Sequence, residues 1–480
     1  MSEMSSNQNS DIPLCVDLDG TLVNTDTLVE SAVLLVKVNP LYLLAMVFWL
    51  FSGKANLKEQ IASRTKLAVE ILPYNQPLLD WLRGQRESGR KLVLVTAANF
   101  RIAQAIEEQL QLFSDVVAST ATCNLGADRK RDELVQRFGK GGYDYVGNSR
   151  DDLQVWSGCR RAVLVNASTA ISTETARLVE IEATFPRLHN PLRALMSGMR
   201  PHQWSKNLLI FVSILVAHTY TDTALLTSTI IAFLSFCLCS SSVYLINDLL
   251  DLEVDRKHSE KHNRPFASGR APVILGIFAT PVLLVASGVL AWIAGTLFLG
   301  VLGLYFALTL AYSLYLKRLV LLDVLILAIL YTLRIIAGAS VADAMPSVWL
   351  VSFSMFIFTS LAMAKRYAEL KSLEGESGAW ASGRGYHVSD ISLIAQLGTA
   401  SGYISVLVFA LYIDSRDVLT MYHNQQLMWL LCPLLMYWVG RIWLVATRGE
   451  LHQDPVIFAT RDRTSYLVVF LGLLTIMAAL

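Results

Sequence analysis

The chain has 480 residues, of which 54% are hydrophobic and 16% are charged, and its formal net charge at pH 7 is +1. Soluble domains carry about 25% charged residues, so this composition excludes a wholly soluble protein and indicates a membrane protein. The net charge says nothing about partners by itself, because the position of the charges matters more. No nucleic-acid partner is expected.

The composition changes along the chain. Up to about Arg193 the sequence mixes charged, polar and apolar residues as a soluble domain does, and after Arg200 it becomes a series of long apolar runs. The first residues, MSEMSSNQNS, lack the basic region and the apolar core of a signal peptide. We therefore expect the first part to stay on the cytoplasmic side of the membrane.

Three apolar segments in the first part each end in polar residues. PLCV leads into VDLDGTL, which holds Asp17 and Asp19; LVLVTAAN holds Thr96; and DYVGNSRDD holds Asn148 and Asp152. Helical patterns alternate with the three segments. This alternation predicts an α/β domain with a doubly wound parallel sheet, whose polar residues meet where the strands end.

These three turns resemble the haloacid dehalogenase superfamily of phosphatases, over residues 11–166. The resemblance implies roles for four side chains: the nucleophile Asp17, the general acid/base Asp19, the phosphate-holding hydroxyl of Thr96 and the charge-balancing Lys130. Lys140 is the alternative for the last role. The DxDGTL pattern is specific for the fold and less specific for activity.

The same resemblance implies a Mg²⁺ ion held by Asp17, Asp19 and Asp152. The sequence departs from the family pattern at Asn148, which stands where a metal-binding aspartate is common. This departure suggests weakened metal binding and puts turnover in doubt. Two interpretations therefore stay open, an active phosphatase and a degenerate domain that serves as a scaffold.

Residues at about 25–90 are long enough for a helical cap between the first and second motifs. They contain PLYLLAMVFWLF (Pro40–Phe51), which is apolar almost throughout but too short to span a bilayer. It is either a buried cap helix or a helix pressed on the membrane, with Trp49 at the interface and Lys54 and Lys58 toward headgroups. We favour the second, because a phosphatase that acts on a lipid must meet the bilayer.

Residues 167–198 are expected to form a linker to a membrane domain that covers residues 199–480. A helix needs about 20 apolar residues to cross a bilayer. Nine segments are candidate spans, with approximate limits 204–220, 223–246, 271–292, 296–315, 319–340, 347–364, 391–413, 427–447 and 464–480. The predicted fold class is thus an N-terminal α/β domain followed by an all-α, polytopic membrane domain of about nine helices.

Lys and Arg concentrate in alternate connections between these spans, as the positive-inside rule requires. The pattern places the loop at 247–270 on the cytoplasmic face together with the N-terminal domain. We expect a multi-pass protein of the inner (plasma) membrane.

NDLLDLEVD, at the end of the second candidate span, places four oxygen-bearing side chains on one face of a helix: Asn247, Asp248, Asp251 and Asp255. They repel one another unless a cation lies among them, and hard oxygen ligands with room for phosphate oxygens suit Mg²⁺. The bases that follow, among them Arg264, then hold anionic groups. The alternative is a solvated helix end whose acids are accidental.

NDLLDLEVD and the later RPFASG resemble the first aspartate-rich motif, NDxxDxxxD, of the UbiA-type intramembrane prenyltransferase superfamily. The resemblance runs from about Met199 to the C-terminus, and nine helices is the number in that superfamily. It implies that the four residues of the motif bind Mg²⁺ and the diphosphate of the donor substrate.

The members that use aromatic substrates have a second motif, DxxxD, after the sixth helix. This chain reads AMAKRYAEL there, and further polar residues stand in RPHQWSKN and YSLYLKRLVLLD. Together these motifs resemble the decaprenyl-phosphate phosphoribosyltransferase branch, which transfers 5-phosphoribose from phosphoribosyl diphosphate to a polyprenyl phosphate. The substrate-binding residues so implied are Arg200, Lys206, Asn207, Arg264, Tyr312, Lys317, Asp323, Lys365 and Arg366.

Several of these bases have a second interpretation. Lys317, Lys365 and Arg366 could lie at the membrane interface and serve only topology. Arg334 lies deep in an apolar run, where an arginine is costly and usually faces a polar cavity. It is a further substrate-binding candidate, and its alternative is a structural pair with an acid such as Asp343.

The predicted function is transfer of phosphoribose to a lipid phosphate, with the N-terminal domain removing the 5-phosphate of the product. One rival is prenylation of an aromatic ring, which the missing second DxxxD argues against. A rival of another class is a lipid-binding or transport protein, but carriers place their sites near the bilayer midplane. The length of the lipid and the oligomeric state, a homo-oligomer included, stay open.

Overall fold

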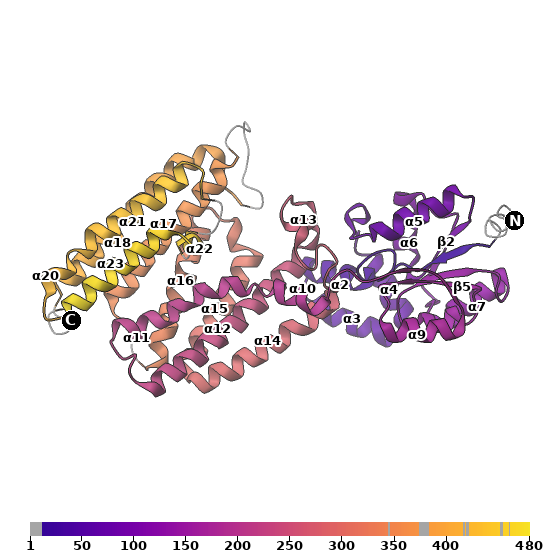
Figure 1. Ribbon diagram of the computed structural model, residues 1–480, viewed down its shortest axis with the longest axis horizontal. Coiled ribbons are helices and arrows are strands. Elements are labelled where there is room, and N and C mark those ends of the chain that lie inside the picture. The colour runs from indigo at the N-terminus through magenta and orange to yellow at the C-terminus, as the bar shows by residue number, and fades with distance from the viewer. Residues whose placement is uncertain are drawn as a thin grey trace. The chain divides into compact units, whose positions relative to one another are not determined.

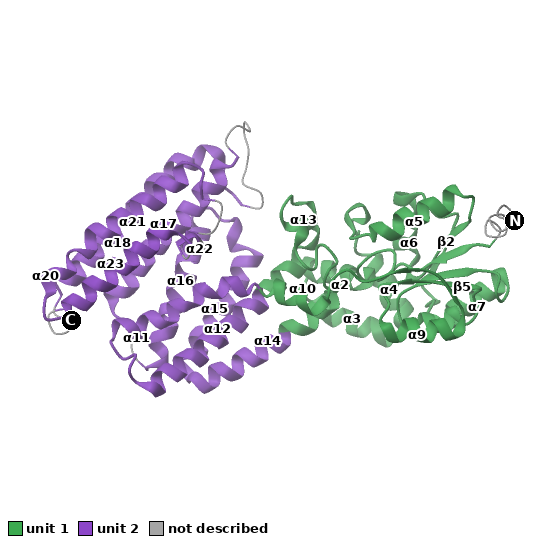
Figure 2. Cartoon of the chain, in the orientation of Figure 1, with its two compact units in different colours: residues 1–199, 244–280 green, residues 200–243, 281–480 purple. Residues whose placement is uncertain are grey.

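The computed structural model describes residues 12–343, 346–373, 384–415, 418, 422–451, 455–459 and 461–480. The start of the predicted N-terminal domain at residue 11, and the segment MSEMSSNQNS, lie outside these residues. The chain forms two compact units (Figure 2): Met1–Met199 with Tyr244–Thr280, and Arg200–Val243 with Pro281–Leu480. The predicted boundary near residue 199 therefore separates them except for one segment, residues 244–280, which packs with the first unit.

The first unit contains a β-sheet, of which Figure 1 labels β2 and β5. Its six strands lie in the order β3-β2-β1-β4-β5-β6, and all neighbouring strands are parallel. The strands are β1 (Leu14–Val16), β2 (Leu92–Asn99), β3 (Asp115–Ser119), β4 (Asp144–Gly147), β5 (Arg161–Val165) and β6 (Glu180–Phe185). The connecting helices are α6 (Phe100–Leu110), α7 (Ala127–Phe138), α8 (Asp152–Trp156) and α9 (Thr169–Leu178). The predicted doubly wound α/β domain is confirmed.

The central strands are buried on both faces. Leu14 and Val16 belong to one apolar core, and Cys15 between them belongs to another. This is the arrangement expected of parallel strands covered by helices on two sides. The short apolar runs that predicted these strands are therefore explained by burial.

The predicted linker at 167–198 is wrong in its first half, because it contains α9 and the sixth strand. β6 pairs in parallel with β5, and Glu182 within it forms an ion pair with Arg90, with Oε1 2.8 Å from Nη1. The strand lies at the edge of the sheet and is only partly buried. It therefore lacks the continuous apolar run that identified the inner strands.

Between β1 and β2 lie four helices and a 3₁₀ turn: α2 (Thr27–Val38), α3 (Tyr42–Phe51), α4 (Lys54–Ala62), η1 (Val69–Ile71) and α5 (Gln76–Glu87). The side chain of Asp26 accepts a hydrogen bond from the Val29 amide and so caps α2. Leu78 and Leu82 of α5 are buried in the core of the sheet. The cap proper is thus narrower than predicted and consists of α2 to α4.

The part of the first unit that comes after the sheet in sequence includes residues 247–255, here called the acidic segment. Helix α10 (Pro191–Gly198) precedes the end of α12 (Thr223–Leu250), which is followed by α13 (Leu252–Lys257), η3 (Lys261–Asn263) and the start of α14 (Val273–Ala294). Asp251 is not helical, so the predicted single helix is two helices with a break. Hydrogen bonds from Asp251 N to Asn247 O (2.9 Å) and from Asp255 N to Asp251 O (2.8 Å) keep the helical spacing across the break.

The second unit is all-α, as predicted. In the described part of the chain, seven helical segments are long and apolar enough to cross a membrane: Thr223–Leu250, Val273–Ala294, Thr296–Leu314, Leu322–Val341, Val348–Lys371, Val388–Ile413 and Gln425–Thr447. They correspond to α12, α14, α15, α16 and α17, to η5 (Val388–Asp390) with α18 (Ile391–Ile413), and to α20 (Gln425–Met428) with α21 (Leu431–Thr447). The ninth predicted segment is α23 (Arg463–Ala479), a shorter apolar helix that follows α22 (Pro455–Ala459).

The first predicted span, 204–220, differs from the others. It consists of a 3₁₀ helix, η2 (Pro201–Phe211), and one turn of α-helix, α11 (Val212–Val216). Trp204 Nε1 donates to Ser241 Oγ (3.0 Å) and Asn207 Nδ2 to Ser240 Oγ (3.3 Å), so side chains tie η2 to α12. These polar ties fix the segment as an irregular helix rather than a long regular one.

Candidate functional site

The carboxylate of Asp17, directly after β1, lies against a lysine. Asp17 Oδ1 accepts a hydrogen bond from Lys130 Nζ at 2.7 Å, and Thr21 Oγ1 donates to Oδ2 at 3.4 Å. Lys130 comes from α7 and is buried, whereas Lys140, the alternative candidate, is exposed beyond the end of that helix. The structure thus places Lys130, of the two lysines, at the predicted nucleophile.

A chain of hydrogen bonds continues from Lys130. Its Nζ donates to Tyr145 Oη (2.9 Å), and Tyr145 Oη donates to Asp152 Oδ1 (2.9 Å). Asp152 Oδ2 accepts from the amides of Asn148 (3.0 Å) and Ser149 (2.9 Å). Asp152 Oδ2 therefore holds the turn after β4, while Oδ1 binds Tyr145 within that strand. The metal-binding role predicted for Asp152 stays a prediction. Tyr145 was not predicted, although its place in the buried strand DYVG offered a signal.

The order of the strands brings the three predicted motifs together, because β1 lies between β2 and β4. Gly20 has φ +73, and a Cβ there would lie 2.1 Å from Asn148 Nδ2, so the turn after β1 touches the turn after β4. Thr96 is buried in β2, and its Oγ1 accepts from the Ala98 amide at 3.0 Å. The predicted residues thus share one edge of the sheet.

The two aspartates of DLDGTL have different electrostatic surroundings. Burial raises the pKa of Asp17 to about 6, although Lys130 acts in the opposite direction. Removal from water, with the nearby charge of Asp26, raises the pKa of Asp19 to about 8. The amide of Thr27, the first residue of α2, donates to Asp19 Oδ1 at 2.8 Å. The pKa of Asp19 is raised further than that of Asp17, and such a difference suits a general acid beside a nucleophile.

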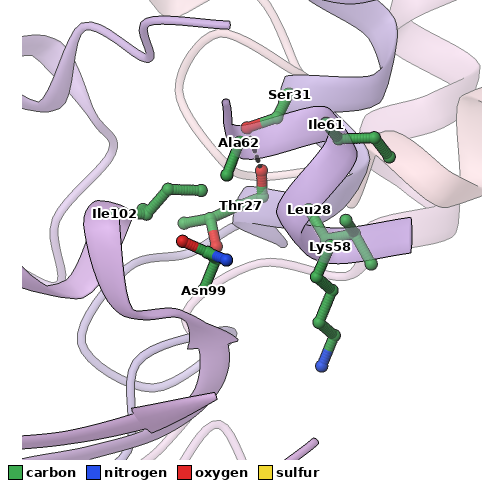
Figure 3. Close-up of a pocket in the computed structure, with 8 residues that line it drawn as sticks. All are labelled: Thr27, Leu28, Ser31, Lys58, Ile61, Ala62, Asn99 and Ile102. Carbon is green, nitrogen blue, oxygen red and sulfur yellow. Dashed lines mark hydrogen bonds between the residues drawn. The ribbon is translucent and has the colours of Figure 1, made fainter. Parts of the chain in front are cut away.

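A small cavity lies where α2 and α4 meet the end of β2 and the start of α6 (Figure 3). Its volume is about 10 Å³, which is room for about one water molecule. Within the described residues, Thr27 Oγ1 has no hydrogen-bond partner. The cavity is lined by Thr27, Leu28, Ser31, Lys58, Ile61, Ala62, Asn99 and Ile102. It is too small for a substrate.

Lys58, in α4, does not point toward lipid headgroups as predicted. Its Nζ donates to Ala97 O at 2.5 Å and to Asn124 Oδ1 at 2.7 Å. Both acceptors belong to the α/β domain, and burial lowers the pKa of this lysine. The prediction for Lys58 is wrong because no local pattern indicates acceptors that lie 39 and 66 residues away.

Helix α3 has no buried residue, so the interpretation as a buried cap helix is wrong. Phe48 is 71% exposed, Leu44 is 64% exposed and Phe51 is 84% exposed. The guanidinium of Arg64 lies 4.9 Å from the centre of the Trp49 ring. A contiguous exposed apolar surface of this kind marks a binding site for protein or membrane.

The acidic segment already holds a positive charge. Arg264 Nη1 lies 3.1 Å from Asp248 Oδ1 and 2.7 Å from Asp255 Oδ2, and the arginine side chain is 27% exposed. Burial raises the pKa of Asp255, although Arg264 opposes the shift. Asp251 Oδ1 lies 3.6 Å from Lys37 Nζ, and Asn247 is half-buried. The prediction that Asp248 and Asp255 share a face is consistent with their common partner.

These carboxylates fit a divalent cation chemically, because they are hard oxygen donors that already bind a cation. Among the residues that the structure describes, no three His, Cys, Asp or Glu side chains lie close enough to hold a metal by themselves. A bound metal would thus need ligands from its substrate or from water.

In the second unit, Arg334 of α16 is buried among polar and aromatic groups. Its Nε donates to Asn207 Oδ1 (2.9 Å), its Nη2 donates to Tyr305 Oη (2.9 Å), and its guanidinium lies 5.3 Å from the centre of the Tyr331 ring. Asp343 is exposed beyond the end of α16, nine residues further on and about 13 Å along the helix direction. These partners replace the pair with Asp343 that the sequence suggested.

Arg366 of α17 belongs to a buried ionic network, the Arg366 cluster. It consists of Arg366, Asp323, Glu369, Tyr312, Tyr386 and Arg384. Arg366 Nε lies 2.6 Å from Asp323 Oδ2 and Nη1 lies 2.7 Å from Glu369 Oε2, and the arginine side chain is 1% exposed. Tyr386 Oη donates to Asp323 Oδ1 at 2.5 Å. The side chains of Asp323 and Tyr312 thus both contact Arg366, which favours a positioning role for them over direct substrate binding.

The remaining predicted bases are less deeply placed. Lys206 Nζ lies 5.7 Å from the centre of the Tyr331 ring, the same ring that Arg334 faces. Lys317, in η4 (Leu316–Arg318), and Lys365 are half-buried, as is Arg200 before η2. Arg334, Asn207 and Lys206 therefore form one group, and the Arg366 cluster forms another.

Three comparisons with known proteins bear on the chain. Residues 208–461 match the model of the UbiA prenyltransferase family. An uncharacterized protein of Sinorhizobium fredii, y4nM, is 38% identical over 461 residues, which are 95% of this chain and 89% of that protein. A decaprenyl-phosphate phosphoribosyltransferase of Mycolicibacterium smegmatis is 32% identical over 302 residues, 61% of this chain and 93% of that enzyme.

Among solved structures, a UbiA homolog from Archaeoglobus fulgidus bound to GPP and Mg²⁺ resembles this chain with a TM-score of 0.46 and 17% identity. The match covers 59% of this chain and 99% of that protein.

Proposed function

Because the chain belongs to the UbiA prenyltransferase family, we propose that its membrane domain transfers 5-phosphoribose from phosphoribosyl diphosphate to a polyprenyl phosphate. The observation that carries the proposal is the acidic segment, where Asp248 and Asp255 both bind the guanidinium of Arg264. The likeness to a decaprenyl-phosphate phosphoribosyltransferase supports this choice of substrates. The basic sequence at Lys365, where aromatic-substrate members have a second acidic motif, agrees with it.

The chemistry needs few groups. Asn247, Asp248, Asp251 and Asp255 would hold Mg²⁺, which when bound neutralises charge on the leaving diphosphate. An oxygen of the lipid phosphate forms a bond to the anomeric carbon, and the bond from that carbon to the diphosphate breaks. No strong general base is required, since the attacking phosphate is already ionised. The lysines at 206, 317 and 365 bind phosphate groups by charge.

We further propose that the N-terminal domain removes the 5-phosphate from the lipid-linked product. Asp17 attacks the phosphorus, the bond to the 5-oxygen breaks, and Asp19 gives its proton to that oxygen. Water then hydrolyses the aspartyl-phosphate. Lys130, 2.7 Å from Asp17, balances the negative charge of the phosphoryl group.

The exposed apolar surface of α3 supports a lipid substrate for this domain. A ten-residue helix without a buried residue is costly in water, and a bilayer surface covers such a helix. We propose that α3 lies on the membrane that the other unit crosses. A spin label at Phe48, in the full chain in nanodiscs, should then be accessible to oxygen and shielded from a polar nickel reagent. Equal access to both reagents would show that α3 is in water.

One experiment tests the transfer. Purified protein is incubated with Mg²⁺, phosphoribosyl diphosphate and a polyprenyl phosphate, and the lipid products are identified by mass spectrometry. A lipid-linked sugar supports the proposal. A protein that ignores phosphoribosyl diphosphate but prenylates an aromatic acid has the rival activity.

The same assay tests the phosphatase. Asp17→Asn should leave phosphoribose transfer intact and make the 5-phosphorylated lipid accumulate, because the nucleophile is lost. Wild-type and variant proteins that give the same ratio of phosphorylated to dephosphorylated lipid would show that the domain is a scaffold. That result would agree with the presence of Asn148 where the family pattern has a metal-binding aspartate.

A further inference from the structure

Helix α2 of the cap connects the predicted phosphatase site with the acidic segment, and all of these residues belong to the first unit. Its first amide, that of Thr27, donates to Asp19 Oδ1 at 2.8 Å. One turn later Glu30 binds Arg256 of α13, and in the last turn Lys37 Nζ lies 3.6 Å from Asp251 Oδ1. One helix thus touches a residue of each predicted site.

The ion pair of Glu30 and Arg256 is two-pronged and buried. Arg256 Nη1 donates to Glu30 Oε2 at 2.8 Å and Nη2 donates to Oε1 at 2.5 Å, while the Glu30 side chain is 2% exposed. Thr25 Oγ1 adds a hydrogen bond to Glu30 Oε1 at 2.6 Å. Paired donors of this kind fix the orientation of both side chains, which a single contact does not do.

Arg256 also fixes the loop that follows the acidic segment. Its Nε donates to Ala267 O at 3.0 Å. Two residues further on, a Cβ added to Gly269 would lie 2.7 Å from Asn24 Cβ and 3.0 Å from Pro73 Cβ, so the loop packs closely on the α/β domain. Arg264, which binds Asp248 and Asp255, lies in this same loop.

We propose that Glu30 is a positioning residue for the transferase: its ion pair with Arg256 holds α13 and the following loop, and with them the carboxylates of the acidic segment. This inference rests on the proposed role of the acidic segment in binding the metal and the diphosphate. The N-terminal domain therefore takes part in transfer through α2, separately from its own phosphatase chemistry.

The first test does not depend on activity. Hydrogen–deuterium exchange of residues 252–270 is compared between wild-type protein and Glu30→Gln, both in nanodiscs. The amides of this segment should exchange at least tenfold faster in the variant. Glu87→Gln, at an exposed glutamate that ends α5, is the matched control and should exchange as wild type does. Unchanged exchange of residues 252–270 in Glu30→Gln would overturn the inference, whatever reaction the protein performs.

The second test follows transfer against Mg²⁺ concentration. Glu30→Gln should need about tenfold more Mg²⁺ for half of its maximal rate, because the carboxylates are less well ordered. Arg256→Lys, which keeps one charge, should show a smaller shift. If wild-type protein transfers phosphoribose and Glu30→Gln has the same Mg²⁺ dependence, the positioning role is wrong while the proposed function stands. If wild-type protein does not transfer phosphoribose, the proposed function fails, and the exchange experiment alone decides the positioning.

A double variant separates positioning from misfolding. Glu30→Gln leaves Arg256 as a buried, partly unpaired charge, which by itself destabilises a protein. Glu30→Gln/Arg256→Gln removes both charges and should unfold no more readily than the single variant, yet keep the raised Mg²⁺ requirement and the fast exchange. Recovery of both properties in the double variant would show that only the unpaired charge mattered and would overturn the proposal.

Discussion

Two arginine–carboxylate clusters of this chain look alike in sequence and differ in their exposure to water. Arg264 binds Asp248 and Asp255 and is 27% exposed, whereas Arg366 binds Asp323 and Glu369 and is 1% exposed. A cation that water reaches can be exchanged for another. A cation sealed among its partners can only be lost at high cost, because a buried charge without a partner is strongly destabilising.

The difference separates function from architecture. Both arginines were candidate substrate-binding residues, since both stand near the predicted cytoplasmic ends of helices. The Arg366 cluster, in which Arg366 and Asp323 are buried, joins α16, α17, Arg384 and Tyr386, and we expect it to serve the fold. We propose that Asp248 and Asp255 exchange their contact with the partly exposed Arg264 for a metal and a diphosphate. The four predictions that follow would break or sharpen this contrast.

The largest effect is expected from Arg366→Gln. It leaves Asp323 buried without its closest cation, which should lower the free energy of unfolding by about 3–5 kcal/mol. The thermal unfolding midpoint of the purified protein measures this. Added Mg²⁺ should not restore the midpoint, because the side chain of Asp323 is fully buried. A variant with the stability of the wild type would show that Arg366 is not structural.

Asp248→Asn and Asp251→Asn should reduce transfer while leaving the fold intact. Loss of a metal ligand or of the group that orients one typically costs 10–100-fold. The rate of lipid-linked sugar formation checks this, with yield and monodispersity in detergent as controls for folding. Near-normal rates in both variants would remove the metal assignment.

Arg264→Gln should destabilise the protein less than Arg366→Gln does. The size of this destabilisation should depend on whether Mg²⁺ is present. Without Arg264 the carboxylates of Asp248 and Asp255 repel each other, and a ligand that binds only the folded state stabilises it by mass action. The unfolding midpoint of Arg264→Gln should therefore approach that of the wild type when Mg²⁺ is present and stay below it when Mg²⁺ is absent. Equal midpoints in both conditions would mean that no metal binds between these residues.

The smallest effects are expected from Lys317→Ala and Lys365→Ala. Each removes one half-buried charge, so the KM for a phosphorylated substrate should rise several-fold with little change in unfolding. Steady-state kinetics with each substrate varied in turn will show which phosphate each lysine contacts. Unchanged KM values for both substrates would favour the interface role considered from the sequence.

Local patterns were enough to predict much of this molecule. Short apolar runs predicted three of the six strands, β1, β2 and β4. The spacing of Asp248 and Asp255 predicted a shared face, and their common contact with Arg264 is consistent with it. These features depend on neighbours a few residues apart. Strand β6 was not predicted because partial burial blurs its pattern. The segment at 204–220 was predicted as a span, but its 3₁₀ conformation and its hydrogen bonds to α12 were not.

Partners far apart in the sequence could not be predicted. Lys58 turns inward to Ala97 and Asn124, and Arg256 finds Glu30 from 226 residues away. No local pattern marks such pairs, because the fold alone brings them together. The resemblance likewise implied a substrate-binding role for Arg366, and no local pattern showed that its side chain is buried against Asp323 and Glu369.

Helix α2 also limits how chains of this kind can vary. It contacts Asp19 at its first residue and Asp251 in its last turn, and the ten residues from Thr27 to Lys37 rise about 15 Å. One inserted residue after Glu30 would turn Lys37 by about 100° to another face, whereas an inserted turn would keep its face and lengthen the helix by about 5 Å. Insertions and deletions in α2 should therefore survive selection only as whole turns, and the spacing of the two carboxylate sites can change in steps but not gradually.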